Sequence, residues 1–159
     1  MSSEAENQAH EERVLLRSEE VRGAALACDL RGASDTPEER IAEYGRLFAH
    51  ALLERTRSAD GVEFVFAAKP GVADWVVDLA RREAACCPFS TYHVTQAGDR
   101  VRWITSSQAG PQVQAILDEF HALPEGIAQG MTGLFARLAA RGVQIVANGA
   151  RCFCVTESR

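Results

Sequence analysis

Hydrophobic positions follow a helical spacing in two long stretches of the chain, each with a clear start or stop. Residues 36–39 read Thr-Pro-Glu-Glu, which supplies an N-cap, a proline at the first helical position and a glutamate that closes a capping box. An apolar face follows, made of Ile41, Tyr44, Leu47, Phe48, Ala51 and Leu52. This pattern predicts a helix that runs to about residue 57. A second helix is predicted from Val72 to the Cys86-Cys87 step, because Pro88 disfavours helical geometry at the residue before it.

Short apolar runs rich in β-branched and aromatic residues predict strands at 62–67, 89–96 and 100–106. Ala97-Gly98-Asp99 joins the last two and predicts a hairpin. Two more helices are predicted at 112–123 and from 124 to about 141. An Asn148-Gly149 step between apolar runs predicts a second hairpin, with strands at 143–147 and 151–156. Residues 13–31 carry only a weak helical signal.

The predicted order contains a βαββα core, followed by two helices and a returning pair of strands. It favours the α+β class, with an antiparallel sheet that has helices on one face, and a ferredoxin-like arrangement is one candidate. We expect the C-terminal hairpin to join this sheet, because Val143, Ile145 and Phe153 would otherwise leave an apolar edge unburied. Residues 1–12 are polar and acidic and are expected to be disordered, which leaves 13–159 as a single domain.

Composition and charge narrow the range of partners. The 159 residues carry a net charge of −5, without the clustered Lys/Arg excess that a nucleic-acid surface needs. No run approaches the roughly 20 apolar residues of a membrane helix. The acidic N-terminal segment lacks the features of a signal peptide, so a cytoplasmic location is expected. No glycine-rich phosphate loop or short hydrolase motif is present, and no nucleotide cofactor is expected. The expected partner is a metal ion or small molecule, and a homodimer is compatible with the sequence.

The five cysteines are the residues most able to carry chemistry. In a reducing compartment they are better interpreted as thiols or metal ligands than as disulfides. Cys86 and Cys87 are the strongest feature, because two neighbouring thiols can share one thiophilic ion. Their place at a helix C-terminus opposes a thiolate, and Arg81 and Arg82 offset this only in part, which favours a metal ligand over an activated nucleophile. The alternative is that both cysteines are small buried hydrophobes at the junction between a helix and a strand.

Among the other candidate ligands, Cys28 is expected to join this pair, and the rest are weaker candidates. Cys28 lies in an apolar segment before the first capped helix, and we expect it to converge with Cys86 and Cys87 on a three-sulfur site. Cys152 and Cys154 share one face of a predicted strand and are better interpreted as core residues. His93, also on a predicted strand, is better interpreted as exposed or hydrogen-bonded.

A family resemblance rests on Ala27-Cys28-Asp29-Leu30, on residues 61–64 and on the segment 82–89, which contains Glu83-Ala84-Ala85-Cys86-Cys87. These stretches resemble a family of small uncharacterised proteins with an early cysteine and an E-x-x-C-C-x-F segment. Some of these resemble neighbours or C-terminal extensions of MerR-type metal-responsive regulators. The resemblance covers about residues 26–120, touches Cys28, Cys86 and Cys87, and implies handling of heavy metals. The chain departs from the pattern at Asp29, where threonine is usual, and at Ser90, where an aromatic residue is common.

Three functions follow in order of preference. The first is thiol-based binding of a soft metal or metalloid, for sensing or sequestration, with mercury, arsenic, zinc or copper as candidate ions. The second is a small-molecule-binding or dimerisation domain with structural cysteines, which would show an apolar pocket away from every sulfur. The third is a cysteine-dependent enzyme, such as a reductase or a carbon–metal lyase. A lyase would need a proton donor, and Asp29 and His93 are the candidates.

Overall fold

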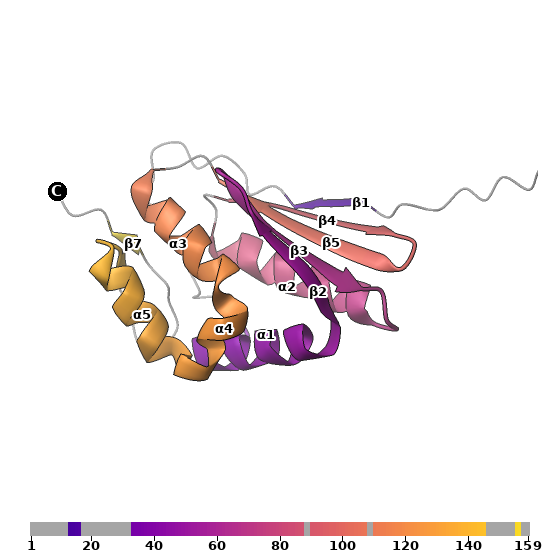
Figure 1. Cartoon of the computed structure of the whole chain (residues 1–159), viewed down its shortest axis with the longest axis horizontal. Helices are drawn as coiled ribbons and strands as arrows, with labels where there is room; N and C mark the ends of the chain where they lie inside the picture. The colour runs from indigo at the N-terminus through magenta and orange to yellow at the C-terminus, as the bar shows by residue number, and fades with distance from the viewer. Residues whose placement is uncertain (1–12, 17–32, 88–89, 108–109, 146–154, 157–159) are drawn as a thin grey trace, which may run out of the picture.

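The structure, a computed structural model, describes residues 13–16, 33–87, 90–107, 110–145 and 155–156. Figure 1 follows the chain from the N-terminal strand to the C-terminal pair. The elements in order are β1 (Arg13–Leu16), α1 (Pro37–Ala51), β2 (Leu52–Arg57), β3 (Gly61–Ala67), α2 (Val72–Cys86), β4 (Thr91–Ala97), β5 (Arg100–Ser106), α3 (Pro111–His121), α4 (Leu123–Gly126), a 3₁₀ turn (Ile127–Gln129), α5 (Gly130–Ala140), β6 (Gln144–Ile145) and β7 (Val155–Thr156).

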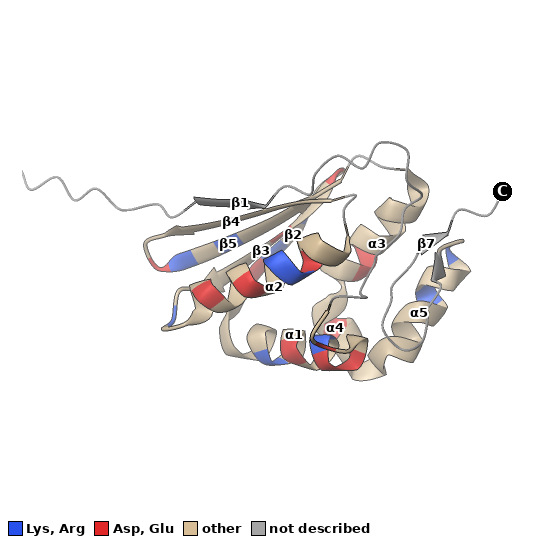
Figure 2. Cartoon of the chain, turned by 180° about the vertical axis from the view of Figure 1, so that it is seen from behind, with Lys and Arg blue, Asp and Glu red and all other residues tan. Residues whose placement is uncertain are grey.

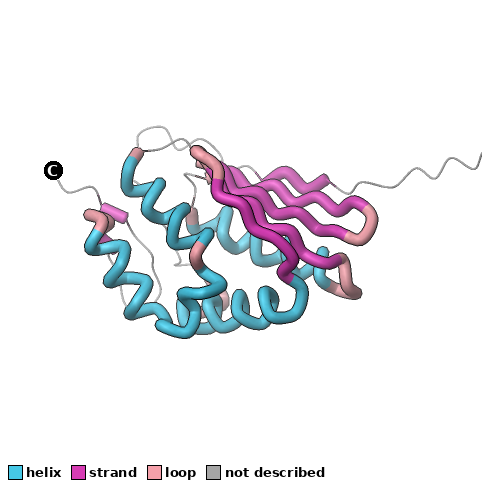
Figure 3. The backbone as a smooth tube through the Cα atoms, in the orientation of Figure 1, coloured by secondary structure: helices cyan, strands magenta, loops and turns pink. Residues whose placement is uncertain are grey.

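The main sheet has five strands in the order β1-β4-β5-β3-β2, and every neighbouring pair is antiparallel. Strand β5 lies between β3 and β4, so β3-α2-β4 is a split βαβ unit. The helices gather on one side of this sheet (Figure 3). The α+β class and the βαββα order β3-α2-β4-β5-α3 are therefore confirmed.

The core lies between the sheet and the helices and is strongly aromatic. Phe64 of β3 pairs with Trp103 of β5, which pairs with Val94 of β4, and all three are buried. The ring of Tyr44 from α1 stacks on Trp103 at 5.9 Å between centroids. Phe120 from α3 meets Phe64 edge to face at 5.1 Å. These contacts fix α1 and α3 against the same face of the sheet.

The first helix starts as predicted but ends earlier. Thr36 Oγ1 accepts from the Glu39 amide at 3.2 Å, and the Glu39 carboxylate accepts from the Thr36 amide at 2.8 Å. The prediction that this helix runs to about residue 57 is wrong, because it stops at Ala51 and strand β2 follows directly. Pairing with β3 overrides the local helical spacing, and Arg57 Nε anchors the new strand to Asp118 of α3 at 2.8 Å.

The C-terminal part departs further from the expectation. The predicted helix from 124 to about 141 is divided, because a 3₁₀ turn separates α4 from α5, which begins at Gly130 with φ 64°. Strands β6 and β7 pair with each other in a separate two-stranded sheet, so the prediction that they join the main sheet is wrong. In the described residues no strand after α3 joins the main sheet, and the ferredoxin-like arrangement is not confirmed. Within 13–31, residues Arg13–Leu16 form a strand and not a helix.

Candidate functional site

The end of α2 brings two sulfur atoms together. Cys86 is the last helical residue and is 3% exposed, and Cys87 is the half-buried C-cap. Consecutive side chains diverge on a continuing helix. Cys87 leaves helical geometry, with φ −122° and ψ 76°, and its Sγ lies 3.5 Å from Cys86 Sγ. We call Cys86 and Cys87 the dithiol pair. The predicted burial at the helix end is confirmed for Cys86 and holds in part for Cys87.

A carboxylate completes the group of donor atoms. Glu83 lies one turn before the pair, and its ligand oxygen and the two sulfurs all lie within 4.8 Å of one another. One carboxylate oxygen, Oε1, accepts from Arg40 Nη1 at 3.1 Å and from the Tyr44 hydroxyl at 3.0 Å. The other, Oε2, faces Cys86 Sγ at 3.7 Å. The two donors thus hold the carboxylate while its second oxygen points at the sulfurs.

Arg40 is the cation of this site. Its Nε and Nη2 donate to the two oxygens of Asp35, each at 2.7 Å, in a bidentate pair. Its Nη1 lies 3.9 Å from Cys86 Sγ as well as against Glu83. The Arg40 side chain is only 8% exposed, so its charge acts on the sulfur and the carboxylates with little screening by water. A guanidinium beside a thiol favours the thiolate, which is the form that binds soft ions.

Burial and these charges shift the acidity of the neighbouring groups. Loss of hydration raises the pKa of Glu83 to about 7, and the nearby Cys86 sulfur adds to this rise against the opposing effect of Arg40. Burial also raises the pKa of Tyr44 well above its usual value. The hydrogen bonds from Arg40 keep the pKa of Asp35 below its usual value. The carboxyl group beside the dithiol pair therefore holds a proton more tightly than an exposed glutamate does.

A second arginine ties the two helices together behind the pair. Arg82 of α2 donates to Asp35 at 2.8 Å and to both oxygens of Glu43 on α1, at 2.8 and 2.9 Å. Trp75 Nε1 donates to the same Glu43 at 2.8 Å. Figure 2 shows acidic and basic residues interspersed along α1 and α2. Arg82 is thus paired with carboxylates, and the cation that the structure places against Cys86 is Arg40.

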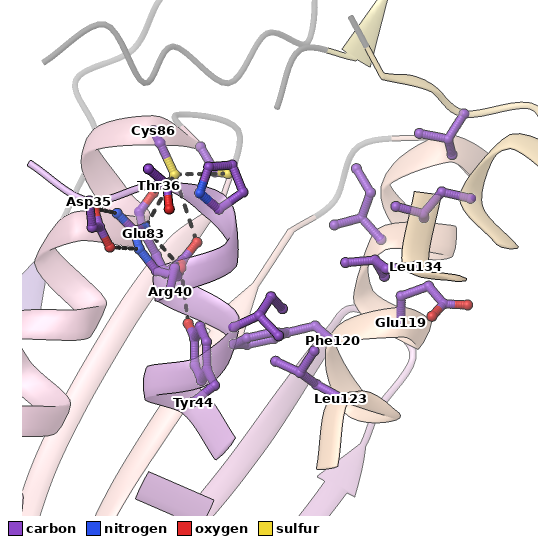
Figure 4. A pocket seen from close by; sticks show the side chains of 16 residues that line it. Asp35, Thr36, Arg40, Tyr44, Glu83, Cys86, Glu119, Phe120, Leu123 and Leu134 are labelled. Atoms are coloured by element: carbon purple, nitrogen blue, oxygen red, sulfur yellow. Dashed lines mark hydrogen bonds and ion pairs between the residues drawn. The ribbon is translucent and has the colours of Figure 1, made fainter. Parts of the chain in front are cut away.

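The dithiol pair lines a partly open cavity of about 130 Å³ with two unlike sides. Figure 4 shows Asp35, Arg40, Glu83 and Cys86 gathered on one side, with Phe120, Leu123 and Leu134 on the other. We call the first side, from the start of α1 and the end of α2, the polar wall. We call the second the apolar wall, and it consists of Ile116, Phe120, Leu123, Leu134, Leu138 and Val143. Glu119 also lines the cavity on the second side, but Arg137 Nε holds its carboxylate at 2.9 Å.

The predicted site residues are only partly brought together. Cys86 and Cys87 are adjacent in space, whereas Cys28, Cys152, Cys154 and Asp29 lie outside the described residues. His93 alternates on β4 with the buried Tyr92 and Val94, so it points to the sheet face away from the helices and does not join the pair. The apolar cavity, expected away from every sulfur if the cysteines were merely structural, is lined by both thiols.

Sequence reasoning missed Arg40, the Glu83 carboxylate beside the sulfurs and the apolar wall. A signal for Arg40 was present, because it lies on the apolar stripe of α1 with Pro37, Tyr44 and Leu47. A charged residue at such a position has to be paired once it is buried. The sequence offered no comparable signal for the apolar wall, which α3, α4, α5 and Val143 form only through the tertiary fold.

Comparison of the chain with protein-family models, with curated proteins and with solved structures gave no match. None of the helices in the part of the chain that the structure describes combines the length and the apolar character needed to cross a membrane.

Proposed function

We propose that this protein binds a soft metal or metalloid ion through Cys86 and Cys87, as a sensing or sequestering module. The observation that carries the proposal is the 3.5 Å separation of two sulfurs beside the Glu83 carboxylate. Thiolates select soft ions, and two thiolates at this separation can bind one ion together. Arg40 supports the proposal, because its charge beside Cys86 offsets part of the cost that the Glu83 carboxylate and the helix C-terminus add to removal of the Cys86 proton.

Cys28 remains our candidate for a third sulfur ligand. A small soft ion bound by the two thiolates and the Glu83 carboxylate would have only two sulfur ligands. In the predicted ligand set of Cys28, Cys86 and Cys87, Cys28 would supply the third. Mercury, arsenic, zinc and copper are the candidate ions, and the apolar wall adds no further ligand beside them.

Competitive titration of the reduced, full-length protein with arsenite and with mercury(II) tests the proposal. We expect one equivalent to bind, and we expect Cys86→Ser and Cys87→Ser each to weaken binding at least tenfold. Cys28→Ser should weaken arsenite binding if the third sulfur takes part. Cys152→Ser is the matched control and should leave the affinity unchanged. Tight binding that survives both Cys86→Ser and Cys87→Ser would contradict the proposal.

A further inference from the structure

We propose that the preferred ligand of this site is a trivalent arsenic centre that carries one apolar organic group, with the arsenic on Cys86 and Cys87 and the group in the cavity. This inference rests on the proposed function and adds the chemical class of the ligand. It follows from the sulfur geometry, from the supply of donor atoms and from the shape of the cavity.

The sulfur separation favours a bent centre over a linear one. With metal–sulfur bonds of about 2.3 Å, as in thiolate sites generally, two sulfurs 3.5 Å apart subtend an angle of about 100° at the ion. A linear dithiolate, the geometry that mercury(II) favours, would need the sulfurs about 4.6 Å apart at the same bond length. Trivalent arsenic has a lone pair and forms pyramidal centres with bond angles a little above a right angle, so the pair as it stands matches arsenic.

On the side of the apolar wall, the described residues leave one position of such a centre to an organic group, because the Glu83 carboxylate lies on the polar wall, where Arg40 and Tyr44 hold it. A pyramidal arsenic has three bonds, and the dithiol pair accounts for two. On the side of the apolar wall the described residues offer one carboxylate, Glu119, and Arg137 occupies it at 2.9 Å. Phe120, Leu123 and Leu134 make up the surface that faces the pair across the cavity (Figure 4). The third bond can therefore point at hydrocarbon, which suits a carbon substituent.

The cavity has the volume and lining for such a group. Its volume is about 130 Å³, close to that of an engineered cavity of about 150 Å³ lined by leucine, isoleucine and phenylalanine that binds benzene. Burying a ring of about the size of benzene against leucine and phenylalanine side chains favours binding through the hydrophobic effect. An ion with no substituent would leave this volume unused.

The binding reaction needs no other reactant. An organoarsenic(III) oxide, R–As=O, reacts with the two thiols to form two As–S bonds. The arsenic–oxygen bond breaks, and the oxygen leaves as water with the two thiol protons. Arsenic stays trivalent, and nothing is oxidised or reduced.

The experiment compares phenylarsine oxide with arsenite, each in competition with dithiothreitol, so that the intrinsic strength of the As–S bonds cancels. On the full-length reduced protein, we expect phenylarsine oxide to partition toward the protein at least tenfold more than arsenite does. Leu134→Phe fills the apolar side and should remove this advantage while leaving arsenite binding in place. Leu53→Phe, at an exposed position on β2 that does not line the cavity, is the matched control and should change neither ligand.

A second measurement does not depend on a variant folding. In the wild-type complex, we expect nuclear Overhauser contacts between the phenyl protons and the methyl groups of Leu123 and Leu134. Equal partition of the two ligands, or a phenyl group without contacts to these leucines, would overturn the inference. The proposed function would still stand in that case if the dithiol pair binds arsenite. Arsenite binding that ignores Cys86→Ser and Cys87→Ser would instead overturn the proposed function.

Discussion

The two walls of the cavity differ in how their side chains are held. On the polar wall every charged group has a named partner, since Arg40 joins Asp35 to Glu83 and Arg82 joins Asp35 to Glu43. On the apolar wall the side chains are fixed by packing alone, and Leu138 and Val143 form a small cluster with Ala115. The first wall therefore sets the positions of donor atoms, and the second sets volume and hydrophobicity.

This difference separates two contributions to binding that are usually mixed. Changes to the polar wall should alter the ion chemistry and, through buried charge, the stability of the whole fold. Changes to the apolar wall should alter stability and the fit of an organic group, but not the affinity for a bare ion.

The largest expected effect is on the polar wall. Arg40→Met leaves Asp35 and Glu83 without their main partner in a buried setting, and we expect a loss of about 3–5 kcal/mol in the free energy of unfolding. Urea unfolding measures the loss. Arg102→Met is the matched control, because Arg102 pairs with Glu63 at an exposed position and should contribute little. Similar losses in the two variants would show that the ion pairs of the polar wall contribute no more to the free energy of unfolding than an exposed ion pair does.

Truncation of a buried side chain on the apolar wall should lower the stability of the fold without changing its affinity for a bare ion. Leu138→Ala removes a side chain that is 4% exposed, and we expect a loss of about 2–4 kcal/mol in the free energy of unfolding. Arsenite titration of the same variant, under conditions where it is folded, should give the wild-type affinity. A large drop in arsenite affinity would mean that the two walls are not independent.

The third prediction concerns pH. The pKa of Glu83 in the fold is about 7, above its usual value of 4.5 in an unfolded chain. Its contribution to stability is therefore fully present below pH 4.5 and is lost as the pH rises through 7. We expect the ion-free wild-type protein to lose roughly 3 kcal/mol across this range relative to Glu83→Gln, from the size of the shift. Urea unfolding of both proteins at several pH values measures the difference, and parallel pH profiles would contradict the assignment.

The smallest expected effect is at the start of α1, which borders the polar wall. Thr36→Ala removes the hydroxyl that accepts from the Glu39 amide, and we expect a loss of about 1 kcal/mol in the free energy of unfolding. Thr36→Ser keeps an accepting hydroxyl and should stay close to wild type. If both variants lose the same stability, the capping bond is not the cause.

The parts of the fold that local chemistry determines could be predicted from the sequence. The capping box at Thr36, the split βαβ order and the end of α2 before Pro88 each depend on a few neighbouring residues. The strand β2 could not be predicted in this way, because Leu52 continues the helical stripe of α1 and only pairing with β3 makes it extended.

The candidate site divides along the same line. Cys86 and Cys87 are adjacent in the sequence, so their proximity was open to inference. Arg40 reaches Cys86 across 46 positions of sequence, and the apolar wall comes from helices further along the chain. Such contacts depend on how α1 and α3 pack on the sheet, which no local pattern encodes.

Arsenic-edge X-ray absorption tests most directly whether Cys86 and Cys87 together bind one soft centre. The sample is the full-length protein with Cys28, Cys152 and Cys154 changed to serine, loaded with one equivalent of phenylarsine oxide. We predict two sulfur neighbours at about 2.3 Å from arsenic and no remaining oxygen neighbour. A spectrum with one sulfur or none, from a protein that is folded and reduced, would contradict the central claim.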